Sequence, residues 1–98
     1  MDLNIYEYLL TIELQFYGGF TPVDEENEDI FSFLRTQGNF GYLIVLNWKA
    51  GNTDWTVPDD IQLGQSILMI GNYTGRDRHL TRQLKLEPYE ARIYTIRL

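Results

Sequence analysis

Carboxylates are the densest chemistry-bearing residues in this chain. Five of them fall within six positions, at Asp24, Glu25, Glu26, Glu28 and Asp29. A calcium loop alternates its ligands, places a glycine at its sharp turn and ends on a bidentate glutamate. This run lacks that register, so we expect a solvated acidic loop and no metal site.

Asp59 and Asp60 form a second acidic pair, which could in principle act as the two carboxylates of a glycosidase. Adjacent residues on an extended chain point to opposite sides, so the two would not flank one bond. Because they follow Pro58, we interpret them as turn residues. His79 is the only histidine, and its neighbours Arg76, Asp77 and Arg78 indicate an exposed loop without a nucleophile in reach. We expect no catalytic residue in this chain.

The segment Gly71-Asn72-Tyr73-Thr74-Gly75 carries two glycines but lacks the lysine and the following helix of a phosphate-binding loop. Asn72-Tyr73-Thr74 is formally a glycosylation sequon, which matters only for a secreted chain. We expect no cofactor site here.

Exposed aromatic rings can stack on sugar faces, and Trp55 and Tyr73 are the candidates for carbohydrate contact. A core interpretation competes with this one. Trp48 continues the apolar side of Tyr42, Ile44 and Leu46, which predicts a core position for it. Trp55 shares its side of a strand with Val57, which is also a core pattern.

The composition excludes several classes of protein. The chain has no cysteine, so disulfides and thiolate sites are ruled out, and a reducing, cytoplasmic location is expected. The net charge of −6 disfavours nucleic acid as a partner. No apolar run is long enough to span a bilayer, and no basic leader is visible, so no membrane association is expected. Residues 1–60 hold eleven acids against two bases, whereas residues 61–98 hold three acids against six bases.

Turn residues recur at intervals of about ten, with short apolar runs between them, which is typical of an all-β sandwich. We predict a two-sheet antiparallel, Greek-key sandwich of about seven or eight strands, with Gln37-Gly38-Asn39 as a tight hairpin turn. The expected strands are Leu9–Tyr17, Ile30–Thr36, Phe40–Trp48, Thr53–Val57, Ser66–Ile70, Thr81–Glu87 and Arg92–Arg97. Gly18-Gly19 is expected to be a turn.

Three of these strands are apolar on both faces. In the expected strand Phe40–Trp48, Tyr42, Ile44 and Leu46 lie on one face, and Leu43 and Val45 lie on the other. Likewise Ile67 and Met69 oppose Leu68 and Ile70, and Ile93 opposes Tyr94 and Ile96. A sandwich of two layers covers one face of each sheet only. We therefore expect a further cover: a neighbouring domain, a second copy of the chain, or the N-terminal segment. The alternative is that these residues lie under loops.

Residues 1–17 allow two interpretations. Leu10, Ile12, Leu14 and Phe16 alternate with polar residues, as in a strand. Asp2 could instead cap a helix that carries Leu3, Tyr6 and Leu10 on one stripe. We expect a strand from about Leu9, and we treat 1–17 as an N-terminal segment and 18–98 as the domain.

Five segments carry a family resemblance. They are Phe16–Phe20 (FYGGF), Asp29–Arg35 (DIFSFLR), Tyr42–Trp48 (YLIVLNW), Met69–Tyr73 (MIGNY) and Pro88–Tyr94 (PYEARIY). In this order they resemble the C-terminal β-sandwich domain of oligo-1,6-glucosidases and α-glucosidases of the α-amylase family, glycoside hydrolase family 13. One position departs from the pattern, since Gly19 stands where the family often has aspartate.

The resemblance implies an accessory role. In that family two carboxylates on a (β/α)₈ barrel perform the chemistry, and a barrel of about 250 residues does not fit in this chain. The implied function is to pack against the barrel of a retaining α-glucosidase and stabilise it, without catalysis by this chain alone. The implied segment 1–17 would be the end of the last barrel helix, or an added strand. The alternatives are a carbohydrate-binding module and a domain that self-associates with a second copy.

Overall fold

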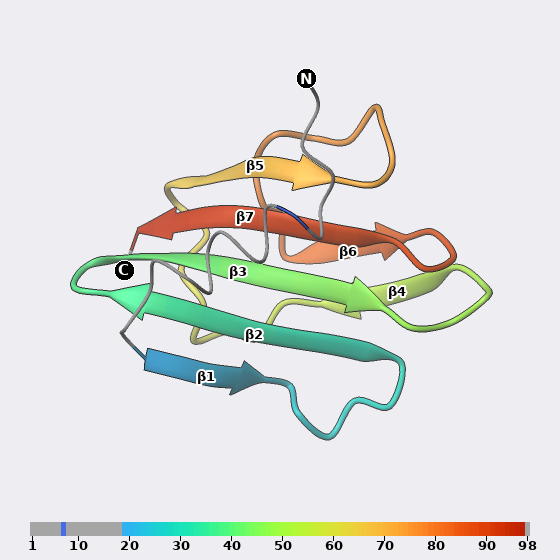
Figure 1. Cartoon of the computed structure of the whole chain (residues 1–98), viewed down its shortest axis with the longest axis horizontal. Coiled ribbons are helices and arrows are strands. Elements are labelled where there is room, and N and C mark those ends of the chain that lie inside the picture. Colours follow the sequence, from blue (N-terminus) through green and yellow to red (C-terminus); the bar gives the residue numbers. More distant parts are fainter. Residues whose placement is uncertain (1–6, 8–18, 98) are drawn as a thin grey trace.

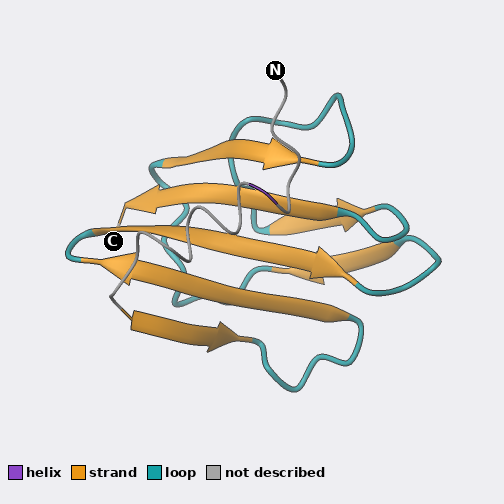
Figure 2. Ribbon diagram, viewed as in Figure 1, coloured by secondary structure: helices purple, strands orange, loops and turns teal. Residues whose placement is uncertain are grey.

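The computed structural model describes Glu7 and residues 19–97. Seven strands make up the regular structure of residues 19–97 (Figure 2). They are β1 (Gly19–Val23), β2 (Ile30–Gln37), β3 (Phe40–Asn47), β4 (Thr53–Thr56), β5 (Ser66–Gly71), β6 (Gln83–Leu86) and β7 (Ala91–Arg97). The many tyrosine and phenylalanine residues, which favour strands, and the regular spacing of turn residues account for this all-β architecture.

The strands form two antiparallel sheets. One has five strands in the order β1-β2-β3-β7-β5, and the other pairs β4 with β6. Figure 1 shows the five strands side by side, with β4 and β6 in a second layer behind them. The neighbours β3, β7 and β5 are not consecutive in sequence, so the chain crosses between the sheets, as it does in Greek-key sandwiches. The predicted two-sheet antiparallel sandwich is confirmed.

The main core lies between the two sheets. Leu43, Val45 and Tyr94 reach it from the large sheet, and Trp55 and Leu84 reach it from the small one. All five are buried. This arrangement follows from the period of two along each strand, which sends alternate side chains to the same face.

The opposite face of the large sheet carries a second buried cluster, made of Phe33, Ile44, Ala91 and Ile93. The middle strands β3 and β7 are therefore buried on both faces, as their sequences predict. At the margins of this outer face, large apolar side chains are exposed instead.

The hairpin between β2 and β3 is confirmed. Gly38 and Asn39 connect the strands, and Gly38 has a positive φ of 65°. Such a φ at the first central position is typical of a two-residue hairpin turn. At Gly41 a Cβ atom would lie 2.7 Å from the Arg35 carbonyl oxygen, so only glycine fits this close approach of the two strands.

Strand β1 corrects a prediction, because Gly19 begins a strand and does not form a turn. Gly19 pairs with Thr36, and Val23 pairs with Ser32. The sequence pattern missed the strand since Gly19 and Pro22 are both poor strand formers. At the edge of a sheet one side of a strand needs no hydrogen bonds, so a proline there is tolerated.

Strand β5 corrects a second prediction. A register shift between Leu68 and Ile70 places these two residues on opposite faces. Leu68 packs against the main core, whereas Ile70 packs against the outer cluster. Ile67 and Met69 are exposed rather than covered. An irregularity of this kind adds a residue to one strand and resets its alternation, which simple periodicity does not anticipate.

The predicted strand Leu9–Tyr17 and the helical alternative for residues 1–17 lie outside the described residues, apart from Glu7. The predicted strand Thr81–Glu87 is shorter in the structure, at Gln83–Leu86. Across Glu7 and residues 19–97, no helix has both the length and the apolar character needed to traverse a bilayer.

Candidate functional site

The acidic loop between β1 and β2 (residues 24–29) is built by local hydrogen bonds. Asn27 Oδ1 accepts from the backbone N–H groups of Asp29 and Ile30, at 2.9 and 3.1 Å. Asn27 Nδ2 donates to Asp24 Oδ2 at 3.0 Å. Asp24 also accepts a bond from the indole Nε1 of Trp55, and its backbone has a positive φ of 51°. The loop thus has a defined shape, which turn-forming Asn and Asp residues favour.

These bonds act on the Asp24 carboxylate. The hydrogen bond from Asn27, followed by the one from Trp55, holds the pKa of Asp24 below its usual value. Donors that bond the charged form of a carboxylate favour ionisation. Asp24 is therefore a structural anion that joins the loop to the main core.

Beside this loop lies a row of exposed aromatic rings, which we call the aromatic patch: Phe20, Phe31 and Trp48. Their exposed fractions are 50%, 41% and 59%. Phe33 connects them, because its ring centroid lies 4.9 Å from that of Phe20 and 5.4 Å from that of Phe31. The centroids of Phe31 and Trp48 are 6.5 Å apart. The spacing is that of mutually packed aromatic side chains.

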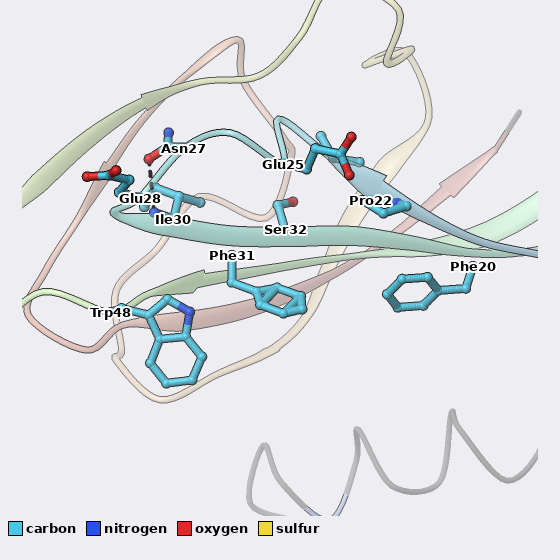
Figure 3. Close-up of a pocket in the computed structure, with 10 residues that line it drawn as sticks. Phe20, Pro22, Glu25, Asn27, Glu28, Ile30, Phe31, Ser32 and Trp48 are labelled. Atoms are coloured by element: carbon cyan, nitrogen blue, oxygen red, sulfur yellow. Dashed lines mark hydrogen bonds between the residues drawn. The ribbon is translucent and has the colours of Figure 1, made fainter.

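The aromatic patch and the acidic loop border one cleft of about 320 Å³. Figure 3 shows the rings of Trp48, Phe31 and Phe20 in a row, with Glu25, Asn27 and Glu28 on the loop next to strand β2. The cleft is also lined by three apolar residues, Pro22, Val23 and Ile30. The cleft therefore has the apolar rings of the aromatic patch on one side, which we call its floor. The carboxylates of Glu25 and Glu28 lie on the other side, which we call its rim.

The carboxylates of the acidic loop differ in their partners. Asp29 pairs with Lys49 at 3.5 Å, in an exposed contact. For Glu25 and Glu28, both exposed, no ion pair is found within the described residues. These two charges are available to a ligand or partner.

The structure separates the two residues that the sequence suggested for carbohydrate contact. Trp55 is only 2% exposed and lies in the main core, so its core interpretation is confirmed and its ring offers no face to a ligand. Tyr73 follows β5, and its hydroxyl donates to the Pro88 carbonyl at 2.7 Å. The Arg76 guanidinium lies 5.4 Å from the Tyr73 ring centroid. Tyr73 is thus a half-buried packing residue.

The predicted core position of Trp48 is wrong. Strand β3 ends at Asn47, so the alternation that would bury the next residue stops one position earlier. The Asn47 side chain marks this end, since it donates to the carbonyls of Gly51 and Glu87 and holds the following turn. The turn residues Lys49 to Asn52 were the available signal for an exposed ring at position 48.

The other candidate motifs fall on turns and loops. The Ile61 N–H donates to the Pro58 carbonyl at 3.0 Å, which confirms the turn around Asp59 and Asp60. Asn72 bonds the backbone of Tyr89 and Ala91 through both ends of its amide. His79 is exposed and its Nδ1 lies 3.0 Å from the Ser66 carbonyl oxygen. Within residues 19–97 and Glu7, no group of three acidic or histidine side chains is placed to hold a metal.

A polar cluster surrounds Glu90 in the segment Pro88–Tyr94, which we call the closing motif. Glu90 has no solvent exposure, and its Oε2 accepts from Arg76 Nε at 2.9 Å and Arg92 Nε at 2.8 Å. Arg76 also reaches Glu87, and Arg92 donates to the Tyr94 hydroxyl at 3.0 Å. Burial opposes ionisation of Glu90, but the bonds from Arg92 and Arg76 outweigh it and lower the pKa of Glu90. Each charged side chain of this cluster is paired with one of opposite charge, so we interpret the cluster as structural.

No family model matches the chain. Among curated proteins, an oligo-1,6-glucosidase from Halalkalibacterium halodurans is 28% identical over 95 residues, and one from Parageobacillus thermoglucosidasius is 30% identical over 82. These matches cover 91% and 84% of the chain. The chain spans only 17% and 15% of the length of these relatives. The chain is homologous to one end of the oligo-1,6-glucosidases.

The fold of the chain agrees with solved structures. A Bacillus licheniformis trehalose-6-phosphate hydrolase superimposes with a TM-score of 0.77 at 20% identity, over 95% of this chain and 18% of that one. At this identity the likeness concerns the fold. The resemblance to glycoside hydrolase family 13 seen in the sequence motifs is confirmed.

Proposed function

We propose that this chain is the accessory C-terminal domain of an oligo-1,6-glucosidase-like enzyme, where it packs against the catalytic barrel and stabilises it. The observation that carries the proposal is the aromatic patch, three neighbouring large rings that remain between 41% and 59% exposed. A protein that works alone rarely leaves such a group of rings in water, and clustered exposed apolar residues are typical of interaction sites.

The energetics favour docking through this surface. Aromatic residues are enriched in protein interfaces, because they bury a large area at a small cost in side-chain entropy. Full burial of a large apolar side chain contributes about 1.5–3 kcal/mol. Each of the three rings is about half exposed, so docking would add about half of that free energy at each ring.

The homology supports the same reading. The relatives named oligo-1,6-glucosidase are about six times longer than the segment that this chain matches, as their coverage of 15–17% implies. The proposed parent is a retaining α-glucosidase whose two catalytic carboxylates lie in the barrel portion. Of the acids that the structure describes, Asp24 is hydrogen-bonded within its loop, and Asp29, Glu87 and Glu90 form ion pairs.

A chimeric enzyme tests the docking role. The 95-residue segment of the Halalkalibacterium halodurans oligo-1,6-glucosidase that matches this chain would be replaced by the full 98-residue chain. The readout is the temperature of half-inactivation for hydrolysis of p-nitrophenyl α-glucoside. We expect an active chimera, and a fall of several degrees for the double variant Phe31→Ala/Trp48→Ala.

The control variant is Tyr89→Asn, which removes another exposed ring at a turn that tolerates asparagine. It should leave the half-inactivation temperature nearly unchanged. In the isolated chain, Trp48→Ala should change stability by less than about 0.5 kcal/mol, since its ring is mostly solvated. Equal effects of Phe31→Ala/Trp48→Ala and of Tyr89→Asn on the chimera would contradict docking through the aromatic patch.

A further inference from the structure

We propose that the cleft beside the acidic loop receives a basic amphipathic helix of the catalytic domain. Its apolar residues would lie on the aromatic patch, and its Lys or Arg side chains would lie beside Glu25 and Glu28. This inference rests on the proposed function and specifies the chemistry of the partner surface.

The floor of the cleft supplies the apolar half of the argument. The rings of Phe20, Phe31 and Trp48 lie in a row beside the cleft of about 320 Å³ (Figure 3). A row of side chains along a sheet margin suits a helix, whose apolar residues repeat at three and four positions on one face. Ring faces attract cations, and the Arg35 guanidinium already lies 5.8 Å from the Phe20 ring centroid. A Lys or Arg stem of the partner would therefore lie over Phe31 and Trp48.

The rim supplies the charge. Asp24 is committed to Asn27 and Trp55, and Asp29 is paired with Lys49. Glu25 and Glu28 line the cleft without an ion pair among the described residues. Uncompensated charges of one sign beside an apolar cleft concentrate the field there and select a cationic partner.

A sugar fits the rim less well than a cation does. Sugar hydroxyls both donate and accept, whereas the two free rim groups only accept. The amide of Asn27 is already engaged with Asp24, and the Ser32 hydroxyl donates to the Ile44 carbonyl at 2.8 Å. The side-chain donors left to the described cleft are then the second N–H of the Asn27 amide and Trp48 Nε1.

A second copy of the chain also fits less well. A symmetric dimer brings the same patch of both subunits together. Two acidic rims would then approach each other, at a chain net charge of −6.

The test uses the full chain and an 18-residue helical peptide of leucine and lysine with the leucines on one face. Trp48 fluorescence reports binding, because Trp55 is buried in the core. We expect saturable binding that weakens as salt rises from 0.05 to 0.5 M. The isomeric peptide with glutamate in place of lysine should not bind.

Two double variants of equal charge locate the site. Glu25→Gln/Glu28→Gln should weaken the lysine peptide about tenfold, since each exposed charge pair contributes a small and similar amount. Asp59→Asn/Asp60→Asn removes two exposed carboxylates outside the cleft and should change affinity less than about twofold.

Several outcomes would overturn the proposal. Equal weakening by both double variants would mean attraction by net charge alone. A Trp48 shift with millimolar isomaltose but none with the peptide would make the cleft a sugar site. A dimer in sedimentation equilibrium that is lost with Phe31→Ala/Trp48→Ala would make the occupant a second copy.

The chimera separates this inference from the proposed function. Absence of peptide binding, together with a lower half-inactivation temperature of the chimera carrying Phe31→Ala/Trp48→Ala, would reject the basic helix and keep the docking role. No effect in the chimera would reject the docking role itself.

Discussion

Glu90 is a fully buried carboxylate held between two arginines, and its side chain joins three parts of the chain. It accepts from Arg76 in the loop after β5 and from Arg92 in β7, and its Oε1 accepts from the Glu87 backbone N–H at 2.8 Å. A buried charge of this kind is stable only when it is fully paired. The closing motif of the sequence is therefore a structural lock between loop and sheet.

Replacing Glu90 with glutamine should destabilise the fold by about 3–5 kcal/mol, because Arg92 and Arg76 would lose their shared carboxylate. Urea unfolding followed by circular dichroism at pH 7 measures this change. Glu87→Gln is the matched control, since the Glu87 side chain is only half-buried and its ion pair with Arg76 contributes about 1 kcal/mol or less. Similar losses in the two variants would contradict the lock.

The same residue predicts a pH dependence. The pKa of Glu90 is lowered in the folded chain, so its stabilising effect is complete above the unfolded value of about 4.3. It is lost as the pH falls through the lower folded-state pKa. Unfolding free energies at pH 7, 4 and 3 should therefore fall more steeply for the wild type than for Glu90→Gln.

The two tryptophans differ in environment, which gives another residue-scale prediction. Trp48 is mostly exposed, whereas Trp55 is buried and donates to Asp24. The variant Trp48→Phe should keep a blue-shifted emission that acrylamide quenches weakly. Emission of this variant that is strongly quenched in the native state would show that Trp55 is accessible.

At the scale of elements, β3 organises the domain. Its side chains enter the main core on one face, through Leu43 and Val45, and the outer cluster on the other, through Ile44. It pairs with β2 and β7 along nearly its whole length. A strand with both edges paired and both faces apolar belongs in the middle of the sheet, as its continuous apolar run predicts.

Leu43→Ala should lower the free energy of unfolding by about 2–5 kcal/mol, because Leu43 is completely buried in the main core. Leu46 is half-buried on the outer face, so Leu46→Ala should cost clearly less. Chemical denaturation of both variants checks the order. A larger loss for Leu46→Ala would mean that the faces of β3 are assigned wrongly.

At the scale of the whole molecule, the domain places its charges and rings unevenly. The aromatic patch and the acidic loop meet at one margin of the large sheet, whereas the Glu90 cluster lies where the loop after β5 meets β7. One region therefore offers an interaction surface, and the other holds the fold together. The rings of the aromatic patch are not part of the Glu90 ion pairs, so we expect that they can be replaced without unfolding the chain.

The purified chain alone should not hydrolyse p-nitrophenyl α-glucoside, because catalysis is proposed to require the barrel of the parent enzyme. A colorimetric assay over a range of protein concentrations measures this. A rate that rises in proportion to purified protein, and that is absent from a mock purification, would contradict the accessory role.

The sequence by itself determined the features that depend on local chemistry. Apolar residues on both sides of the expected strands Phe40–Trp48 and Arg92–Arg97 predicted cover on both faces, and Gln37-Gly38-Asn39 predicted the hairpin. The ordered motifs predicted the resemblance to oligo-1,6-glucosidases. These signals are readable because side-chain period and turn preference act within a few residues.

The tertiary structure decided which aromatic residues are available. Trp48 and Trp55 have similar patterns, yet the end of β3 at Asn47 exposes the first and the β4–β6 layer buries the second. The edge pairing of β1 and the irregularity at Leu68 also arise from partners distant in sequence. Exposure depends on what packs against a side chain, and strand pairing across long separations sets that packing.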